Sequence, residues 1–274
     1  MVHTHRIALG FEYEGTEFSG FQTQATNAQV STVQDQLQTC LSQIASHAVE
    51  TVCSGRTDSG VHALQQVVHF DTSAIRPMQA WTRGLNGLLP KSIAVRWART
   101  VPDSFHARHS ALERRYTYVL CSEAVRPSLR RHQVGWTHHG LELCAMQQAA
   151  ALLVGTHDFS SFRASQCQAA SPVRRVSELR VEQSGALFFI TAQANGFLHH
   201  MVRNIVGALV YVGSGRLSVA QFQAVFAAKD RRLGAPTFAP EGLYFCGTHY
   251  PDYFNIPKPV ALEMLGGHTN PLKA

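Results

Sequence analysis

The chain alternates between a hydrophobic period of two residues, which is typical of strands, and a period of three to four, which is typical of helices. Residues 7–13 (IALGFEY) and 114–120 (RRYTYVL) carry apolar or aromatic side chains at every second position. This alternation predicts half-buried strands. Residues 177–196 contain two β-rich runs separated by Ser184 and Gly185, which predicts a β-hairpin.

Four segments show the helical period: residues 31–46, 141–155, 197–213 and 218–230. In the first, Ser31 and Gln34 have the spacing of a capping box, so we expect Ser31 to cap the helix. In the third, apolar residues recur at steps of four and three, which predicts a helix with one face on the core. Residues 85–100 (LNGLLPKSIAVRWART) instead predict a loop followed by a strand.

The order of these elements indicates two units of mixed helix and strand. A strand, a helix and further strands occupy residues 1–105, whereas strands, a helix, a hairpin and further helices occupy residues 106–274. We therefore predict an α/β (α+β) fold with two domains, 1–105 and 106–274.

Composition agrees with a folded chain and indicates a class of partner. Hydrophobic residues make up 45% and charged residues 15% of the 274 residues, so we expect a substantial core. The net charge of +6 favours a polyanionic partner such as nucleic acid, with an inert basic surface as the alternative. Arginine greatly outnumbers lysine, and arginine suits bidentate contacts with phosphate.

Several patterns bear on the cellular compartment. No apolar run reaches the ~20 residues that a membrane-spanning helix needs. Residues 1–13 lack the pattern of a secretory signal peptide. The six cysteines are scattered without close pairing, which is typical of a reducing compartment. We therefore predict a cytoplasmic protein with no membrane partner.

The segment CSGRTDSGVHA, residues 53–63, lies between two predicted strands and holds Arg56 and Asp58 between glycines. A tight turn explains this composition, because Gly adopts unusual φ angles and Asp and Ser bond to their own backbone. The alternative is that the Asp58 carboxylate is catalytic. The local pattern alone favours the turn.

Arg203 is the most informative single residue. It lies within MVRNIVGALVYVG, a helix that is apolar on most sides, so we expect its guanidinium to be partly buried and paired. One interpretation is a structural ion pair, or a charged head that extends to water along an apolar surface. The functional interpretation is that Arg203 meets a carboxylate such as Asp58 and favours its ionised form.

Cations and aromatic residues are interleaved in SFHARHSALERRYTYVL. Its arginines are Arg108, Arg114 and Arg115. On a nucleic-acid surface, such arginines meet phosphates while a ring such as Tyr116 stacks on a base. The alternative is an ordinary strand whose tyrosines pack inward. In either case strand alternation places Tyr116 on one face and Arg115 on the other.

Histidine pairs and cofactor motifs give weaker signals. His138–His139 and His199–His200 are adjacent, and neighbours on a helix do not face one site, so we expect no metal site at either pair. The sequence contains no P-loop, GxGxxG or G-x-S-x-G motif, so no nucleotide or nicotinamide cofactor is indicated.

Seven segments together resemble the tRNA pseudouridine synthase A family, in that family's order and over almost the whole chain. They are EYEGTEFSGFQ, SGRTDSGVHA, LNGLLP, FHARHSALERRYTY, THDFSSFR, GFLHHMVRNIVGAL and APEGLYF. SGRTDSGVHA and GFLHHMVRNIVGAL are specific signals of this family. Their joint occurrence therefore favours the interpretation of Asp58 as a catalytic residue over that of a plain turn residue. Phe21 and Ser59 stand where the family commonly has Trp and Ala, and neither removes a reactive group.

The resemblance implies isomerisation of uridine to pseudouridine at positions 38, 39 and 40 in the anticodon stem-loop of tRNA, without cofactor or metal. It also implies a homodimer whose chains have two ferredoxin-like (RRM-like) units with mainly antiparallel sheets joined around a central catalytic cleft. Five residues take roles by resemblance: Asp58 as nucleophile, Arg203 as its partner, Tyr116 against the base, Arg56 in the space left by the extruded nucleotide, and Leu243 in the pocket wall.

Two other functions would use the same residues. A non-catalytic RNA-binding module would use the same cations and rings but would form no pseudouridine. A metal-dependent hydrolase built on the many histidines would lose activity with a chelator, whereas the isomerase would not.

Overall fold

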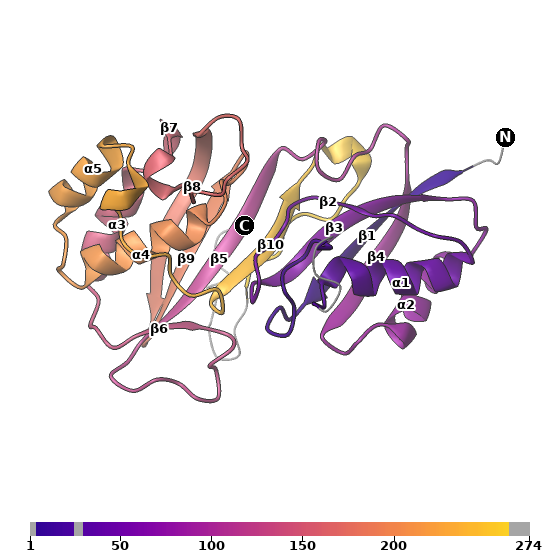
Figure 1. Ribbon diagram of the computed structural model, residues 1–274, viewed down its shortest axis with the longest axis horizontal. Helices are drawn as coiled ribbons and strands as arrows, with labels where there is room; N and C mark the ends of the chain where they lie inside the picture. The colour runs from indigo at the N-terminus through magenta and orange to yellow at the C-terminus, as the bar shows by residue number, and fades with distance from the viewer. Residues whose placement is uncertain (1–3, 25–29, 263–274) are drawn as a thin grey trace.

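A single twisted sheet runs through the molecule, as Figure 1 shows. The structure is a computed structural model that describes residues 4–24 and 30–262. The main path of the sheet follows the order β4 (Ile93–Val101), β1 (His5–Tyr13), β3 (His62–Thr72), β10 (Leu243–His249), β5 (Glu113–Ser122), β9 (Leu187–Ala194), β8 (Val173–Ser184) and β7 (Gly155–Asp158). Two short strands lie beside this path, β2 (Val52–Cys53) next to β3 and β6 (Gly135–Thr137) next to β5.

The pairing of the strands is mainly antiparallel. Two pairings are parallel, β10 with β3 and β5 with β6, and the others are antiparallel. β10 follows all the other strands in sequence, yet it lies between β3 and β5 and so joins the strands of the two halves (Figure 1). The predicted α/β class with mainly antiparallel sheets is confirmed.

The α-helices form two groups on one face of the sheet. The α-helices are α1 (Val33–Ala45), α2 (Arg83–Leu88), α3 (Leu143–Ala151), α4 (Met201–Gly213) and α5 (Val219–Ala227), and the short 3-10 helices are η1 (Met78–Trp81), η2 (Ser160–Phe162), η3 (Arg231–Leu233) and η4 (Asp252–Phe254). Figure 1 shows α1 and α2 together over the N-terminal strands and α3, α4 and α5 together at the other end. No helix in the described part of the chain combines the length and the apolar character needed to cross a membrane.

Strand alternation accounts for the packing of these helices. In β1, Ile7, Leu9 and Phe11 belong to the large apolar cluster that includes buried residues of both helix groups. Ala8, which points to the opposite face, instead packs with Val67 in a smaller cluster. The period of two in the sequence therefore decides which face of the sheet receives the helices.

Two helices begin later than the sequence pattern predicts. The N-cap of α1 is Thr32 rather than Ser31, because the Asp35 N–H donates to Thr32 Oγ1 at 3.2 Å. α4 begins at Met201 instead of residue 197, because His200 has a left-handed backbone with φ of 60°. Residues 197–200 therefore lie outside the helix.

Residues 85–88, which we expected to lie in a loop, belong to the short helix α2. Gly84 and Gly87 give this segment a low helix propensity. Contacts with the rest of the molecule compensate: Leu85 is buried, and the Asn86 side chain bonds both the N–H and the carbonyl of Val95, at 2.7 and 2.9 Å. Tertiary packing therefore overrides the local preference.

Candidate active site

Asp58 lies on the loop between β2 and β3, and several contacts hold this loop in place. The Tyr13 hydroxyl forms a hydrogen bond of 2.7 Å with Thr57 Oγ1. The Val61 N–H donates to the carbonyl of Asp58 itself at 3.2 Å. Gly60 adopts φ of +77°, which a residue with a side chain rarely tolerates. The tight turn that the local pattern favoured is therefore present, and it also carries the Asp58 side chain.

The two residues that depart from the common family pattern support the same loop. The Phe21 ring is fully buried and lies 6.4 Å from the rings of both Phe11 and Tyr13. Ser59 Oγ donates to the Phe18 carbonyl at 3.1 Å. Neither residue offers a reactive group to its surroundings, so both departures concern packing and loop geometry.

Asp58 borders a cleft of about 1010 Å³. The cleft is lined by segments from both halves of the chain, namely residues 19–24, 51–59, 166–169 and 196–203. Ligand pockets in proteins commonly enclose about 300–1,000 Å³, so this cleft can receive at least a nucleotide-sized group.

Arg203, the partner expected for Asp58, does reach it. Arg203 Nη1 donates to Asp58 Oδ2 at 3.0 Å, across 145 positions of sequence. Arg203 Nε donates to the Phe238 carbonyl at 2.8 Å, which fixes the plane of the guanidinium. The Arg203 side chain is 14% exposed and that of Asp58 is 26% exposed, so the pair is shielded but can still be reached from the cleft.

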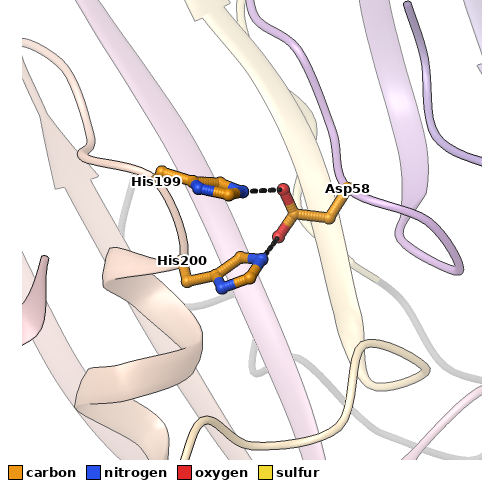
Figure 2. Close-up of side chains that lie close together, drawn as sticks. All are labelled: Asp58, His199 and His200. Atoms are coloured by element: carbon orange, nitrogen blue, oxygen red, sulfur yellow. Dashed lines mark ion pairs between the residues drawn. The ribbon is translucent and has the colours of Figure 1, made fainter. Parts of the chain in front are cut away.

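Two histidines also contact Asp58, and the sequence reasoning missed them. His199 Nε2 lies 3.6 Å from Asp58 Oδ1, and His200 Nε2 lies 3.3 Å from Oδ2. Figure 2 shows both imidazoles pointing at the carboxylate from the segment just before α4. Our expectation that these neighbours cannot face one site is wrong, because it assumed helical geometry, whereas both residues precede α4 and His200 has a left-handed backbone. The late start of α4 had no signal that we recognised in the sequence.

Tyr116 on β5 forms a buried aromatic wall of the cleft. Its ring centre lies 5.2 Å from that of Phe197 and 5.0 Å from that of Phe245. Burial raises the pKa of Tyr116 well above its ordinary value, and the nearby Tyr13 and Asp58 raise it further. The phenol is therefore neutral at physiological pH.

Leu243 and Arg56 also line the cleft, in different environments. Leu243 is the first residue of β10 and is 5% exposed, so it offers an apolar surface. Arg56 lies two positions before Asp58 on the same loop and is exposed. The structure therefore places all five predicted site residues at one cleft.

The arginines of the basic segment do not share one face of the sheet. Arg108 and Arg114 line the cleft, together with Arg174 from β8. Arg115 points to the opposite face, where Nη1 lies 3.3 Å from Glu178 Oε2. Strand alternation predicted this separation, and it removes Arg115 from the set of cleft residues.

This arrangement is suited to carboxylate chemistry. Arg203 holds Asp58 Oδ2, whereas Oδ1 accepts no hydrogen bond from the described residues. A carboxylate with one restrained oxygen and one available oxygen can attack an electrophile or accept a proton. The ligand atoms of Asp58, His199 and His200 lie within 4.8 Å of one another, so these residues could also hold a metal ion.

A family model matches most of the chain. The model described as tRNA pseudouridine synthase matches residues 11–110 and 149–251. The matched segments contain Arg56, Asp58 and Arg203, and Tyr116 lies between them.

Curated relatives match over nearly the full chain, and each is described as tRNA pseudouridine synthase A. The protein from Chromobacterium violaceum is 54% identical over 253 residues, which cover 92% of this chain and 95% of that protein. The protein from Albidiferax ferrireducens is 52% identical over 92% of this chain and 96% of its own length. The protein from Neisseria meningitidis serogroup C is 52% identical over 95% of this chain and 97% of its own length. This chain, with its shielded carboxylate in a cleft between two halves, thus belongs to the tRNA pseudouridine synthase A family of isomerases.

Proposed function

We propose that this isomerase forms pseudouridine at positions 38, 39 and 40 of the anticodon stem-loop of tRNA and that Asp58 is its nucleophile. Family membership gives the general reaction, the isomerisation of uridine to pseudouridine in tRNA. The observation that carries the assignment of Asp58 is its 3.0 Å contact with Arg203 inside the cleft. A shielded carboxylate beside a guanidinium, reachable from a cleft, is typical of functional sites.

The reaction breaks the N1–C1′ bond of uridine, turns the base and joins C5 to C1′. The C5 proton is lost and N1 gains one, so substrate and product have the same composition. Water is not a reactant, and a shielded cleft limits its access. In the proposed mechanism Asp58 Oδ1 either bonds covalently to the substrate or removes a proton from the sugar, while Arg203 restrains Oδ2.

Tyr116 and Leu243 would bind the target base. Extruding a base from the helical stack costs about a few kcal/mol, and contact with an aromatic ring recovers part of this energy. Tyr116 offers such a ring, and Leu243 offers an apolar surface in the same cleft. Because burial keeps the Tyr116 phenol neutral, it is suited to donate a hydrogen bond and poorly suited to remove a proton.

The cations of the cleft would bind the RNA backbone. We assign Arg56 to the space that the extruded nucleotide leaves, because it is exposed and lies on the Asp58 loop. Arg108 and Arg174 line the same cleft and would meet phosphates. Arg114 also has a structural role, because its guanidinium donates hydrogen bonds to the carbonyls of Ser54 and Asn195.

The proposal extends to the organisation of the molecule. Residues 1–105 and 106–274 would form two units, the first with Asp58 and the second with Tyr116 and Arg203. The active form would be a cytoplasmic homodimer that needs no cofactor or metal. The exposed apolar side chains of Leu129 and Val125, on the loop before β6, would take part in the contact between copies.

The proposal is tested by incubating the purified protein with unmodified tRNA and mapping pseudouridine at each position. We expect product at positions 38, 39 and 40 wherever uridine is present, and none in a tRNA whose uridines there are replaced by cytidine. Asp58→Asn should bind the same tRNA and form no product. Product confined to another region of the tRNA would reject the site assignment, and appreciable turnover by Asp58→Asn would reject the nucleophile.

A further inference from the structure

We propose that a divalent transition metal ion, for which Zn²⁺ is the probe, binds to Asp58, His199 and His200 and inhibits the enzyme reversibly. The bound metal would prevent Asp58 from reacting with tRNA, and the isomerisation itself would need no metal. The binding is inferred from the geometry of three side chains, whereas the inhibition rests on the proposed role of Asp58.

Each histidine nitrogen already lies at nearly the separation that a zinc ion requires from one oxygen of Asp58, and the two histidines approach different oxygens. Zinc is bound at about 2.0–2.2 Å by imidazole nitrogen and carboxylate oxygen, so two tetrahedral ligands stand about 3.4 Å apart. His199 Nε2 lies 3.6 Å from Asp58 Oδ1, and His200 Nε2 lies 3.3 Å from Oδ2. All three ligand atoms are within 4.8 Å of one another, so small side-chain rotations complete the site.

The chemistry of the ligands selects the type of metal. Two imidazoles and one carboxylate suit zinc, cobalt, nickel or ferrous iron. Mg²⁺ prefers oxygen ligands and retains its waters, so it competes poorly for this set. The side chains of His199, His200 and Asp58 are 36%, 29% and 26% exposed, so an ion can enter from the cleft and keep water in its remaining positions.

Two features indicate a reversible inhibitor rather than a permanently bound metal. Arg203 bonds to Asp58 Oδ2, and its positive charge opposes a second cation on the same carboxylate. In resident metal sites the second nitrogen of each histidine usually has a hydrogen-bond partner. Within the described residues, neither His199 nor His200 has such a partner for Nδ1. A bound ion would nevertheless occupy Asp58 Oδ1, the oxygen proposed to react.

A second pair of adjacent histidines provides a matched control. The rings of His138 and His139 lie 3.9 Å apart, as do those of His199 and His200. The neighbour of this second pair is a cation, because Arg216 Nη2 lies 2.9 Å from His139 Nε2. The described residues hold one cluster with metal-ligand spacing, and His138 and His139 are not in it. Adjacent histidines alone are therefore not expected to bind the ion.

The binding is tested by titrating Zn²⁺ calorimetrically into purified protein without an affinity tag. We expect one ion per chain, and we expect His199→Asn and His200→Asn each to lower the affinity by more than about tenfold. Asn is chosen because it tolerates the left-handed backbone of position 200. The double variant His138→Asn/His139→Asn should bind as the wild type does, and excess Mg²⁺ should not displace the zinc. Absence of stoichiometric binding, or binding that both 199 and 200 variants retain, would overturn the proposal.

A separate assay tests the inhibition. Zn²⁺ should stop pseudouridine formation by the wild type and by the 138/139 double variant, and EDTA should restore it. Binding of zinc without loss of turnover would overturn the inhibitory role and would also contradict Asp58 as the nucleophile. A protein that forms no pseudouridine even without zinc would reject the proposed function, while the calorimetric result would still decide the metal site.

Discussion

Two of the arginine–aspartate pairs among the described residues have surroundings that differ in an informative way. Arg6 and Asp71 face each other across β1 and β3, and both carboxylate oxygens accept hydrogen bonds of 2.8 Å from the guanidinium. The remaining Arg6 donor meets the carbonyls of Asp103 and Phe105 at 2.7 and 2.9 Å. In the cleft, Arg203 bonds to one oxygen of Asp58 and leaves Oδ1 without a hydrogen bond from the described residues.

This difference distinguishes a structural pair from one suited to chemistry. The Arg6–Asp71 pair joins neighbouring strands to the loop after β4, and Arg6 lowers the pKa of Asp71 by hydrogen bonding. All its polar atoms are engaged, so it has nothing to offer a substrate. The Asp58–Arg203 pair joins remote segments beside a cleft and keeps one carboxylate oxygen available. A shielded carboxylate that keeps one oxygen without a hydrogen-bond partner is the feature that indicates a functional site.

The sharpest contrast compares the two aspartates. Asp58→Asn should lower the rate of pseudouridine formation by more than about 1,000-fold, because the amide is a poor nucleophile and a poor base. Asp71→Asn should leave the rate per folded molecule unchanged and lower the free energy of unfolding by about 1 kcal/mol or less, since Asp71 is half exposed. Single-turnover kinetics and urea unfolding measure the two effects. Equal loss of activity in both variants would erase the distinction.

The two arginines should separate activity from stability in the same way. Arg203→Met should reduce the rate by roughly 100-fold or more, because the charge that balances Asp58 is removed. Its melting temperature should change less than that of Arg6→Met, which leaves two backbone carbonyls and Asp71 without their donor and should cost about 1–3 kcal/mol. If the Arg203→Met variant has a lower melting temperature but full activity per folded molecule, the role of Arg203 is structural.

His69, beside the Arg6–Asp71 pair, should make the stability of that region depend on pH. The pKa of His69 is lowered from 6.5 to about 4, mainly by burial and also by the charges of Arg6 and His106, while Asp71 acts in the opposite direction. Between these two values the unfolded chain binds a proton that the native chain does not, so stability falls as pH falls from 6.5 to 4. The loss at pH 4 should be on the order of 2 kcal/mol.

The matched variant for this prediction is His69→Gln, which can still accept the hydrogen bond that the Ala107 N–H donates to His69 Nδ1. Urea unfolding at several pH values should show a shallower pH dependence for the variant than for the wild type. An identical slope in both proteins would assign the pH dependence to other groups.

The smallest effect is expected at Tyr116. Tyr116→Phe keeps the ring between Phe197 and Phe245 and removes a hydroxyl that burial keeps neutral, so the rate should fall by no more than about tenfold. Tyr116→Ala, which removes the ring, should lose much more activity in the same assay. A loss above about 100-fold in Tyr116→Phe would instead indicate that the hydroxyl transfers a proton.

Local pattern was sufficient where the signal repeats along one element. The period of two in residues 7–13 and 114–120 gave these two strands and the faces of Tyr116 and Arg115. The net charge indicated a polyanionic partner, whereas tRNA and Asp58 were singled out only by the resemblance to a family. It was insufficient at element ends. The cap of α1 lies one residue later because Thr32, and not Ser31, accepts from Asp35, and α4 begins four residues late because of the backbone angle of His200. The helix α2 was missed because contacts of Leu85 and Asn86 with the rest of the molecule outweigh its low propensity.

The sequence by itself determined several of the strands, most α-helices, the basic character and the family, since these follow from residue type and short-range spacing. It gave no indication of β10, the strand that joins the two halves. Tertiary structure alone decided that Asp58 and Arg203, 145 positions apart, meet, and that His199 and His200 join them, while His139 contacts Arg216. The physical reason is that the reactivity of a charged group depends on the groups that surround it in space. Those surroundings depend on which strands pair and, here, on the backbone conformation of His200 just before α4.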